Sequence, residues 1–240
     1  MAEIGMKVSD MNLNWQTYPD SQAVAEGLAD TVADKLRDAV SNRGEAFMAV
    51  SGGTTPKKFF AALSQRKLDW SKVTVTLVDE RFVHEASDRS NAALVRANLL
   101  QNEAASARFI GLYHEAADAT AAAGQASAEL SAQKWPLDVA ILGMGTDGHT
   151  ASFFPDAANL STLIDPAHDA IVEGVDTVAG GEPRLTLPLL RLIEAGFVAL
   201  HIEGSEKRRV LEEATLPDSI HPIRAVLVNA REPVPVYWAA

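Results

Sequence analysis

The chain has 240 residues, of which 47% are hydrophobic and 22% charged, a composition typical of folded globular proteins and far from that of disordered chains. Its formal net charge of −11 argues against a nucleic-acid or anionic-membrane partner, because either would be repelled by the charge of the whole molecule. The absence of cysteine excludes disulfides, a thiolate nucleophile and cysteine-bound metal, and it fits a reducing, cytoplasmic location.

The N-terminal part of the chain predicts one long helix. Residues 1–18 carry three charged side chains among scattered apolar ones, so they predict neither a signal peptide nor a membrane span. From Val24 to Val40 an apolar residue recurs at every fourth position. This spacing places the apolar side chains in one stripe along a helix.

Beyond this helix, short apolar runs rich in Val, Ile and Phe alternate with segments of helical character. The alternation predicts a single α/β domain over residues 1–240, with a largely parallel, twisted, Rossmann-like sheet flanked by helices. The predicted strands are 46–50, 73–79, 108–112, 137–143, 171–175, 197–202, 225–229 and 234–238. The Ala-rich stretch 115–133 predicts a further helix, and the irregular stretch 156–182 predicts a loop-rich cap over a site.

In an open parallel sheet, ligands bind at the carboxyl ends of the strands, so polar residues at those ends are site candidates. The first group follows the strand 46–50 and comprises Ser51, Gly52, Gly53 and Thr54. Paired glycines let the backbone approach a ligand, Thr54 or Thr55 is predicted to cap the next helix, and Pro56 suits its first turn. The exposed amides would then bind an anion such as phosphate. The alternative is an ordinary tight turn.

A second group of three adjacent charges, Asp79, Glu80 and Arg81, ends the strand 73–79. The carboxylates suit acid–base chemistry or hydroxyl binding, and the guanidinium suits a phosphate. A solvated loop with an internal ion pair is an equally good interpretation.

A third group follows the strand 137–143 and contains the pattern G-x-G-x-x-G, which raises the possibility of a dinucleotide site. Pro155 would interrupt the helix that such a site requires. The favoured interpretation is a glycine-shaped loop that presents Asp147 and His149, with the carboxylate orienting the imidazole. Histidine is the side chain best suited to take a proton from water near neutral pH.

Two cations complete the candidates, although each alone would be read as a surface charge. Arg184 lies in Pro183–Leu187, and Lys207 follows the strand 197–202. Both lie near predicted sheet edges, where they would supply positive charge to a phosphate. The chain has no Walker A pattern, no H-E-x-x-H and no G-x-S-x-G.

Together these motifs resemble the glucosamine-6-phosphate isomerase/6-phosphogluconolactonase family, and its lactonase branch in particular. The matching motifs occur in the same order along the chain: Ser51–Thr54, Asp79–Phe82 with Ser90–Asn91, Gly143–Pro155, Pro183–Leu187 and Gly204–Lys207. The resemblance implies hydrolysis of 6-phospho-D-glucono-1,5-lactone to 6-phospho-D-gluconate, a step of the oxidative pentose phosphate pathway. It also implies that no metal or organic cofactor is needed. A monomer and a small homo-oligomer are both compatible with the sequence.

The resemblance assigns roles to individual residues. His149 would act as general base on a water, Asp147 would support it, and amides near Gly145 would face the developing oxyanion. The remaining candidates would bind the substrate and its phosphate: Ser51, Gly52, Gly53, Thr54, Asp79, Glu80, Arg81, Asn91, Arg184 and Lys207.

Two alternatives stay open at this point. In the isomerase/deaminase branch a carboxylate that takes part in proton transfer precedes the proline of the central motif, and here Phe154 stands there. Arg81 likewise departs from the aromatic residue that follows Asp-Glu in that branch. A sugar-phosphate sensor is the other alternative, but the chain has no spare segment or basic surface for DNA binding.

Overall fold

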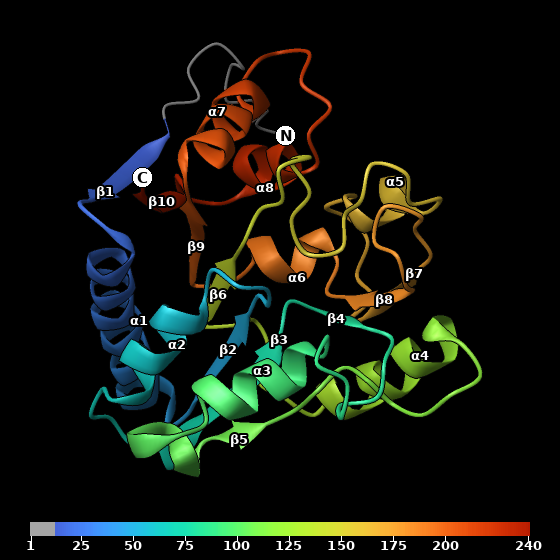
Figure 1. Ribbon diagram of the computed structural model, residues 1–240. Helices are drawn as coiled ribbons and strands as arrows, with labels where there is room; N and C mark the ends of the chain where they lie inside the picture. The colour runs from blue at the N-terminus through green and yellow to red at the C-terminus, as the bar shows by residue number, and fades with distance from the viewer. Residues whose placement is uncertain (1–12) are drawn as a thin grey trace, which may run out of the picture.

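The apolar runs of the chain form a parallel sheet in the computed structural model, which describes residues 13–240. The sheet has seven strands in the order β1-β10-β9-β6-β2-β3-β5, and all neighbouring strands are parallel (Figure 1). These strands are β1 Asn14–Tyr18, β2 Ala46–Val50, β3 Val73–Leu77, β5 Arg108–Phe109, β6 Val139–Leu142, β9 Phe197–Glu203 and β10 Pro235–Ala239. A three-stranded antiparallel sheet, β4-β8-β7, consists of β4 Asp79–Arg81, β7 Glu173–Val175 and β8 Arg184–Thr186.

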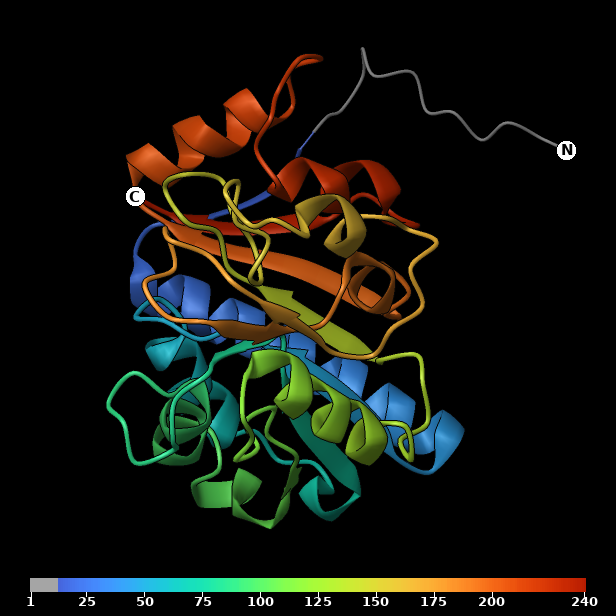
Figure 2. The same cartoon turned by 90° about the vertical axis from the view of Figure 1, so that its right-hand side faces the viewer.

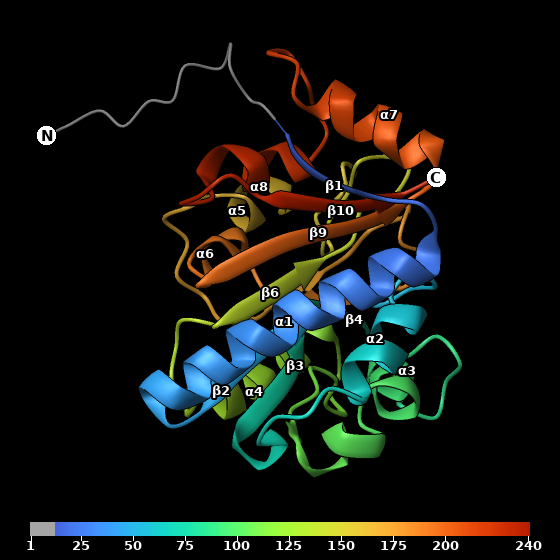
Figure 3. The ribbon, with the colours of Figure 1, turned by 90° about the vertical axis from the view of Figure 1, so that its left-hand side faces the viewer.

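Helices cover both faces of the parallel sheet. Figure 3 shows α1 crossing one face, and Figure 2, from the opposite side, shows α4, α6 and the antiparallel sheet over the other. The helices are α1 Ser21–Arg43, α2 Lys57–Ser64, α3 Asn91–Asn98, α4 Ala119–Leu130, α5 Leu160–Leu163, α6 Leu189–Ile193, α7 Ser205–Ala214 and α8 Ile223–Asn229. Among residues 13–240, no helix combines the length and the apolar character that crossing a membrane requires.

The long predicted helix is confirmed as α1, and its apolar stripe faces the core. Val24, Leu28, Val32 and Leu36 are fully buried, because their fourfold spacing puts them on the side that meets the sheet. The Asp20 side chain caps the helix by accepting a hydrogen bond from the Ala23 amide at 2.8 Å. The buried side chains of helices and sheets form one continuous core, as expected for a single α/β domain.

Two predicted strands are corrected by the structure. Residues 225–229 lie in α8, which begins after Pro222, and the buried side chains Ile223, Val226 and Leu227 have helical rather than alternating spacing. The predicted strand 171–175 is shorter than expected and belongs to the antiparallel sheet as β7.

The predicted strand 73–79 divides into β3 and β4 at Val78. The Val78 amide donates to the Val50 carbonyl of the parallel sheet, and the Val78 carbonyl accepts from the Leu187 amide, which follows β8. The chain therefore passes from one sheet into the other immediately before Asp79. The strands β1 and β8 were not predicted. The prediction that residues 1–18 form no signal peptide concerns mainly residues 1–12, which lie outside the described part of the chain.

Candidate active site

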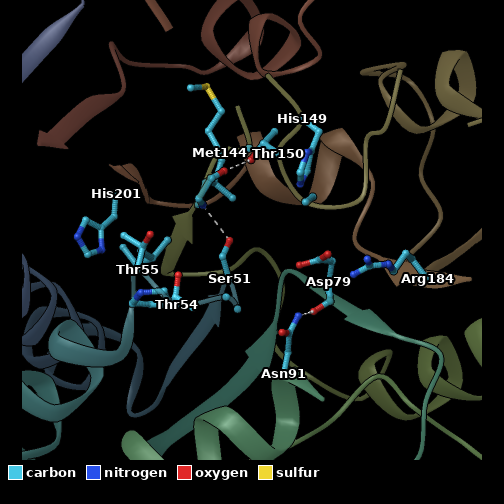
Figure 4. A pocket seen from close by; sticks show the side chains of 18 of the residues that line it. Ser51, Thr54, Thr55, Asp79, Asn91, Met144, His149, Thr150, Arg184 and His201 are labelled. Carbon is cyan, nitrogen blue, oxygen red and sulfur yellow. Dashed lines mark hydrogen bonds between the residues drawn. The ribbon is translucent and has the colours of Figure 1, made fainter. Parts of the chain in front are cut away.

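A cavity of about 330 Å³ opens at the carboxyl ends of the parallel strands, beside the antiparallel sheet. Most predicted site residues line it: Ser51, Gly52, Gly53, Thr54, Asp79, Arg81, Asn91, Gly145, His149, Arg184 and Lys207. Glu80 and Asp147 are not part of the lining. Figure 4 shows His149 facing the cavity from one side, with Asp79 next to Arg184 on another.

The lining also includes residues that were not singled out from the sequence, among them Met144, Thr150, Ala179 and His201. The first two lie inside the glycine-rich motif, and Ala179 comes from the predicted cap segment. His201 lies near the end of β9, so its place at a strand end is the signal that would have found it.

The loop Ser51–Thr54 joins β2 to the turn before α2. The Ser51 hydroxyl accepts from the Gly143 amide at 3.0 Å and so ties this loop to the loop after β6. Within residues 13–240, the amides of Gly52, Gly53 and Thr54 donate no hydrogen bond, which leaves them available to an anion. The prediction that a threonine caps α2 is wrong, because the helix starts at Lys57 after an uncapped Pro56.

Glycine is required at position 52 by a close contact across the cavity floor. A Cβ on Gly52 would lie 1.9 Å from Asn91 Oδ1. The Asn91 side-chain amide in turn donates to the Asp79 carbonyl at 2.8 Å. Asn91 is buried at the start of α3. It therefore fixes the position of the loop Ser51–Thr54 relative to the Asp79 backbone.

Asp79 is a nearly buried carboxylate at the cavity wall. It is 9% exposed, and Ser152 donates a hydroxyl hydrogen bond to its Oδ2 at 2.7 Å. Its neighbour Arg184 has a side chain that is 9% exposed, with a buried Nε that has no hydrogen-bond partner within residues 13–240. A carboxylate acceptor and a guanidinium donor thus stand side by side, which suits the recognition of sugar oxygens.

Glu80 is absent from the cavity lining and instead binds the start of α3, next to the N-cap residue Ser90. It is fully buried, its Oε1 accepts from the amides of Arg81 and Asn91, and its Oε2 accepts from the Ala92 amide and the Ser90 hydroxyl. Burial raises the pKa of Glu80, while these four donors act in the opposite direction. The structure therefore gives Glu80 a structural position, although the sequence predicted substrate binding.

His149 and Asp147 form a close pair on the turn after β6. The distance from His149 Nδ1 to Asp147 Oδ1 is 2.5 Å, and Asp147 Oδ1 also accepts from the His149 amide. The hydrogen bond from the imidazole holds the pKa of the Asp147 carboxyl below its usual value. Because the carboxylate only accepts, Nδ1 carries the proton and Nε2 of a neutral ring is left as the acceptor.

Phe154 packs against the ring of His149. The two ring centroids are 4.4 Å apart with an interplanar angle of 31°, and the guanidinium carbon of Arg184 lies 5.5 Å from the Phe154 centroid. Phe154 is 4% exposed. The Phe154 ring therefore restricts the orientation of the imidazole. Phe154 itself has no titratable group.

Lys207 and Arg81 bring further positive charge to the cavity. Lys207 lies in the first turns of α7, and its burial lowers the pKa of its ammonium group, while the nearby Glu203 carboxylate acts in the opposite direction. Arg81 donates from its guanidinium to the Arg89 carbonyl. The cavity of this acidic protein thus gathers three cations, Arg81, Arg184 and Lys207, around one volume.

The glycine-rich loop does not have the form of a dinucleotide site. The Gly145 amide donates to the His149 carbonyl at 2.9 Å, so it is not free to face an oxyanion as the sequence suggested. Residues 143–159 form turns, and the next helix is the short α5. A pyrophosphate would therefore find no helix N-terminus directly after the loop. Among residues 13–240, no three His, Asp or Glu side chains are grouped as metal ligands.

Comparison with known proteins gives concordant matches over nearly the whole chain. The profile described as glucosamine-6-phosphate isomerases/6-phosphogluconolactonase matches residues 19–238. A 6-phosphogluconolactonase of Mesorhizobium japonicum is 56% identical, covering 97% of this chain and 98% of that protein, and one of Rhizobium meliloti is 51% identical, covering 95% and 100%. The crystal structure of a 6-phosphogluconolactonase from Shewanella baltica matches with a TM-score of 0.92 at 39% identity, covering 95% of this chain and 98% of that one. The chain therefore belongs to the glucosamine-6-phosphate isomerase/6-phosphogluconolactonase family.

Proposed function

We propose that this protein hydrolyses 6-phospho-D-glucono-1,5-lactone to 6-phospho-D-gluconate. The observation that carries the proposal is the His149–Asp147 pair, which faces a cavity that also holds three cations and the free amides after β2. A base and an anion-binding region in one cavity are what a phosphorylated lactone requires. The names of the relatives that match over nearly the whole chain support the same reaction.

In this mechanism His149 Nε2 takes a proton from a water whose oxygen attacks the lactone carbonyl carbon. Asp147 holds the ring in the tautomer that leaves Nε2 unprotonated and stabilises the imidazolium that forms. Collapse of the tetrahedral intermediate breaks the bond between the carbonyl carbon and the ring oxygen. The imidazolium returns its proton to that oxygen, which becomes the hydroxyl of the open-chain acid.

The remaining polar residues bind and orient the sugar phosphate. The amides of Gly52, Gly53 and Thr54, with Lys207, are suited to the phosphate, because backbone donors and an ammonium group stabilise its charge together. Asp79, which Ser152 holds in place, is suited to accept from a sugar hydroxyl. Arg184 lines the cavity, where its guanidinium is suited to donate to a substrate oxygen.

Phe154 favours lactone hydrolysis over the isomerase/deaminase reaction. Its ring occupies the place beside His149 where that reaction would need a second titratable group, and an apolar side chain cannot transfer a proton. A sugar-phosphate sensor without activity would not require the close His149–Asp147 pair. An assay of the purified protein on freshly prepared lactone, with spontaneous hydrolysis subtracted, tests the proposal, and a rate equal to the spontaneous one would refute it.

We further propose that the protein works in the cytoplasm as a monomer or small homo-oligomer. The cysteine-free sequence fits a reducing compartment. The substrate is a charged metabolite of carbohydrate metabolism, which fits the same location.

Replacing Lys207 by Ala is expected to raise KM much more than it lowers kcat. A contact to a phosphate remote from the reacting carbon is made in the ground state and the transition state alike. Loss of one charge-assisted contact corresponds to about 1.5–3 kcal/mol of binding free energy. Steady-state kinetics and inhibition by 6-phosphogluconate measure the effect. Lys134→Ala is the matched control, since Lys134 is exposed, lies outside the cavity and precedes β6, whereas the cavity opens where the strands end. A KM equal in both variants would remove Lys207 from the phosphate site.

Activity is expected to survive exhaustive chelation, and the protein is expected to show no saturable binding of NAD or NADP. Chelation should have no effect because His149 acts as the base in this mechanism. Dinucleotides should not bind because no helix follows the G-x-G-x-x-G loop directly. The measurements are turnover after dialysis against a chelator and titration calorimetry with each dinucleotide. Loss of turnover that added metal restores, or tight dinucleotide binding, would contradict this expectation.

A further inference from the structure

A second histidine, His221, contacts the turn that carries the catalytic pair. It lies in the segment between α7 and α8, and its side chain is 25% exposed. His221 Nδ1 lies 3.1 Å from the backbone carbonyl oxygen of Asp147. A carbonyl oxygen only accepts, so Nδ1 must carry a proton at this contact.

The start of α8 and the His221 ring make two further contacts with this turn. The Ile223 amide donates to the Gly148 carbonyl at 3.0 Å. A Cβ at Gly148, whose φ is +79°, would lie 2.5 Å from His221 Nδ1, so the imidazole packs directly on the glycine backbone. The turn thus accepts one side-chain hydrogen bond from the segment before α8 and one backbone hydrogen bond from the first residue of α8.

The opposite nitrogen of the ring faces the helix that carries Lys207. His221 Nε2 lies 3.9 Å from Glu213 Oε2, and Glu213 is in the last turn of α7. This separation is longer than a hydrogen bond, so the orientation of the imidazole is set by its contacts with the turn.

We propose that His221 is a positioning residue for the reaction, which fixes the backbone of Asp147 and through it the orientation of His149. The proposal rests on the proposed lactonase function. Asp147 Oδ1 accepts from the side chain and from the amide of His149, so displacement of the Asp147 backbone moves the imidazole relative to the cavity. His221 does not line the cavity and makes no contact with substrate in this mechanism.

The test compares three substitutions at His221 in the full-length protein. His221→Ala is expected to lower kcat about tenfold with little change in KM, because catalysis depends steeply on the placement of the base whereas the phosphate contacts are untouched. His221→Asn is expected to recover most of the lost kcat, because its side-chain amide lies where Nδ1 was. His221→Gln, whose amide lies one bond further out, is expected to remain slow.

Ile220→Ala is the matched control, since Ile220 is the neighbouring residue and is 87% exposed. Thermal unfolding of every variant measures whether the fold is retained. If His221→Ala does not fold, the comparison of Asn with Gln still decides the question. An unchanged kcat in His221→Ala, or an Asn variant as slow as the Gln variant, would overturn the proposal. A wild type without lactonase activity would instead refute the proposed function.

Discussion

Replacing His149 by Asn is expected to lower kcat for lactone hydrolysis by on the order of 10² to 10⁴ while leaving affinity for 6-phosphogluconate nearly unchanged. The help of a general base is realised in the transition state, so its removal does not loosen the ground-state complex. The wild-type kcat/KM is expected to fall on acidification, because an imidazolium cannot accept a proton from water. Stopped assays at slightly acidic pH keep the spontaneous reaction slow.

His168→Asn is the matched control for this substitution. His168 also pairs with a carboxylate, at 2.8 Å from its Nε2 to Glu173 Oε1, but it lies outside the cavity. Circular dichroism and product binding establish that both variants are folded. Turnover near the wild-type level in the folded His149→Asn protein would remove His149 from the mechanism, and Asp79 would become the next candidate base.

Replacing Glu80 by Leu is expected to reduce the free energy of unfolding by about 3–5 kcal/mol, the cost typical of breaking a buried, hydrogen-bonded charged group. Three backbone amides and the Ser90 hydroxyl would lose their acceptor in a site closed to water. Urea titration followed by tryptophan fluorescence measures the change. Activity should fall as well, because Glu80 anchors the start of α3, where Asn91 supports Asp79.

Two milder substitutions calibrate this result. Glu80→Gln retains one carbonyl oxygen as acceptor and is expected to be intermediate in stability. Glu85→Gln, at a side chain that is 42% exposed and paired with Arg96, is expected to be close to neutral. A Glu80→Leu protein within about 1 kcal/mol of the wild type would show that the cap of α3 is not needed, because such a change is in the range of ordinary single substitutions.

The parallel sheet and the principal loops could be predicted from the sequence because their signals are local. The run Ala46–Val50 is apolar at every position since both faces of β2 are covered, and the glycines and hydroxyls that follow it mark the start of a loop. The same holds for β6 and the turn with Asp147 and His149. Each of these signals lies within about ten residues of the chain, so no knowledge of the tertiary structure is required.

The parts that could not be predicted depend on contacts between distant residues. The pairing of β4, β7 and β8 into an antiparallel sheet was not predicted, because strands of three residues are too short to show alternation. The hydrogen bond from Ser152 to Asp79 joins residues 73 positions apart, and that from His221 to Asp147 joins residues 74 apart. The role of Glu80 was missed for the same reason, since its charge suggests a ligand until the buried donors of α3 are placed around it.

The position of Val78 has a mechanical consequence. Its amide is bonded to the parallel sheet and its carbonyl to the segment after β8, so the two sheets share this backbone position. Because Asp79 follows Val78 directly, its backbone position is set by both sheets at once. The Asp79 carboxylate therefore keeps its place at the cavity wall only while the two sheets stay packed against each other.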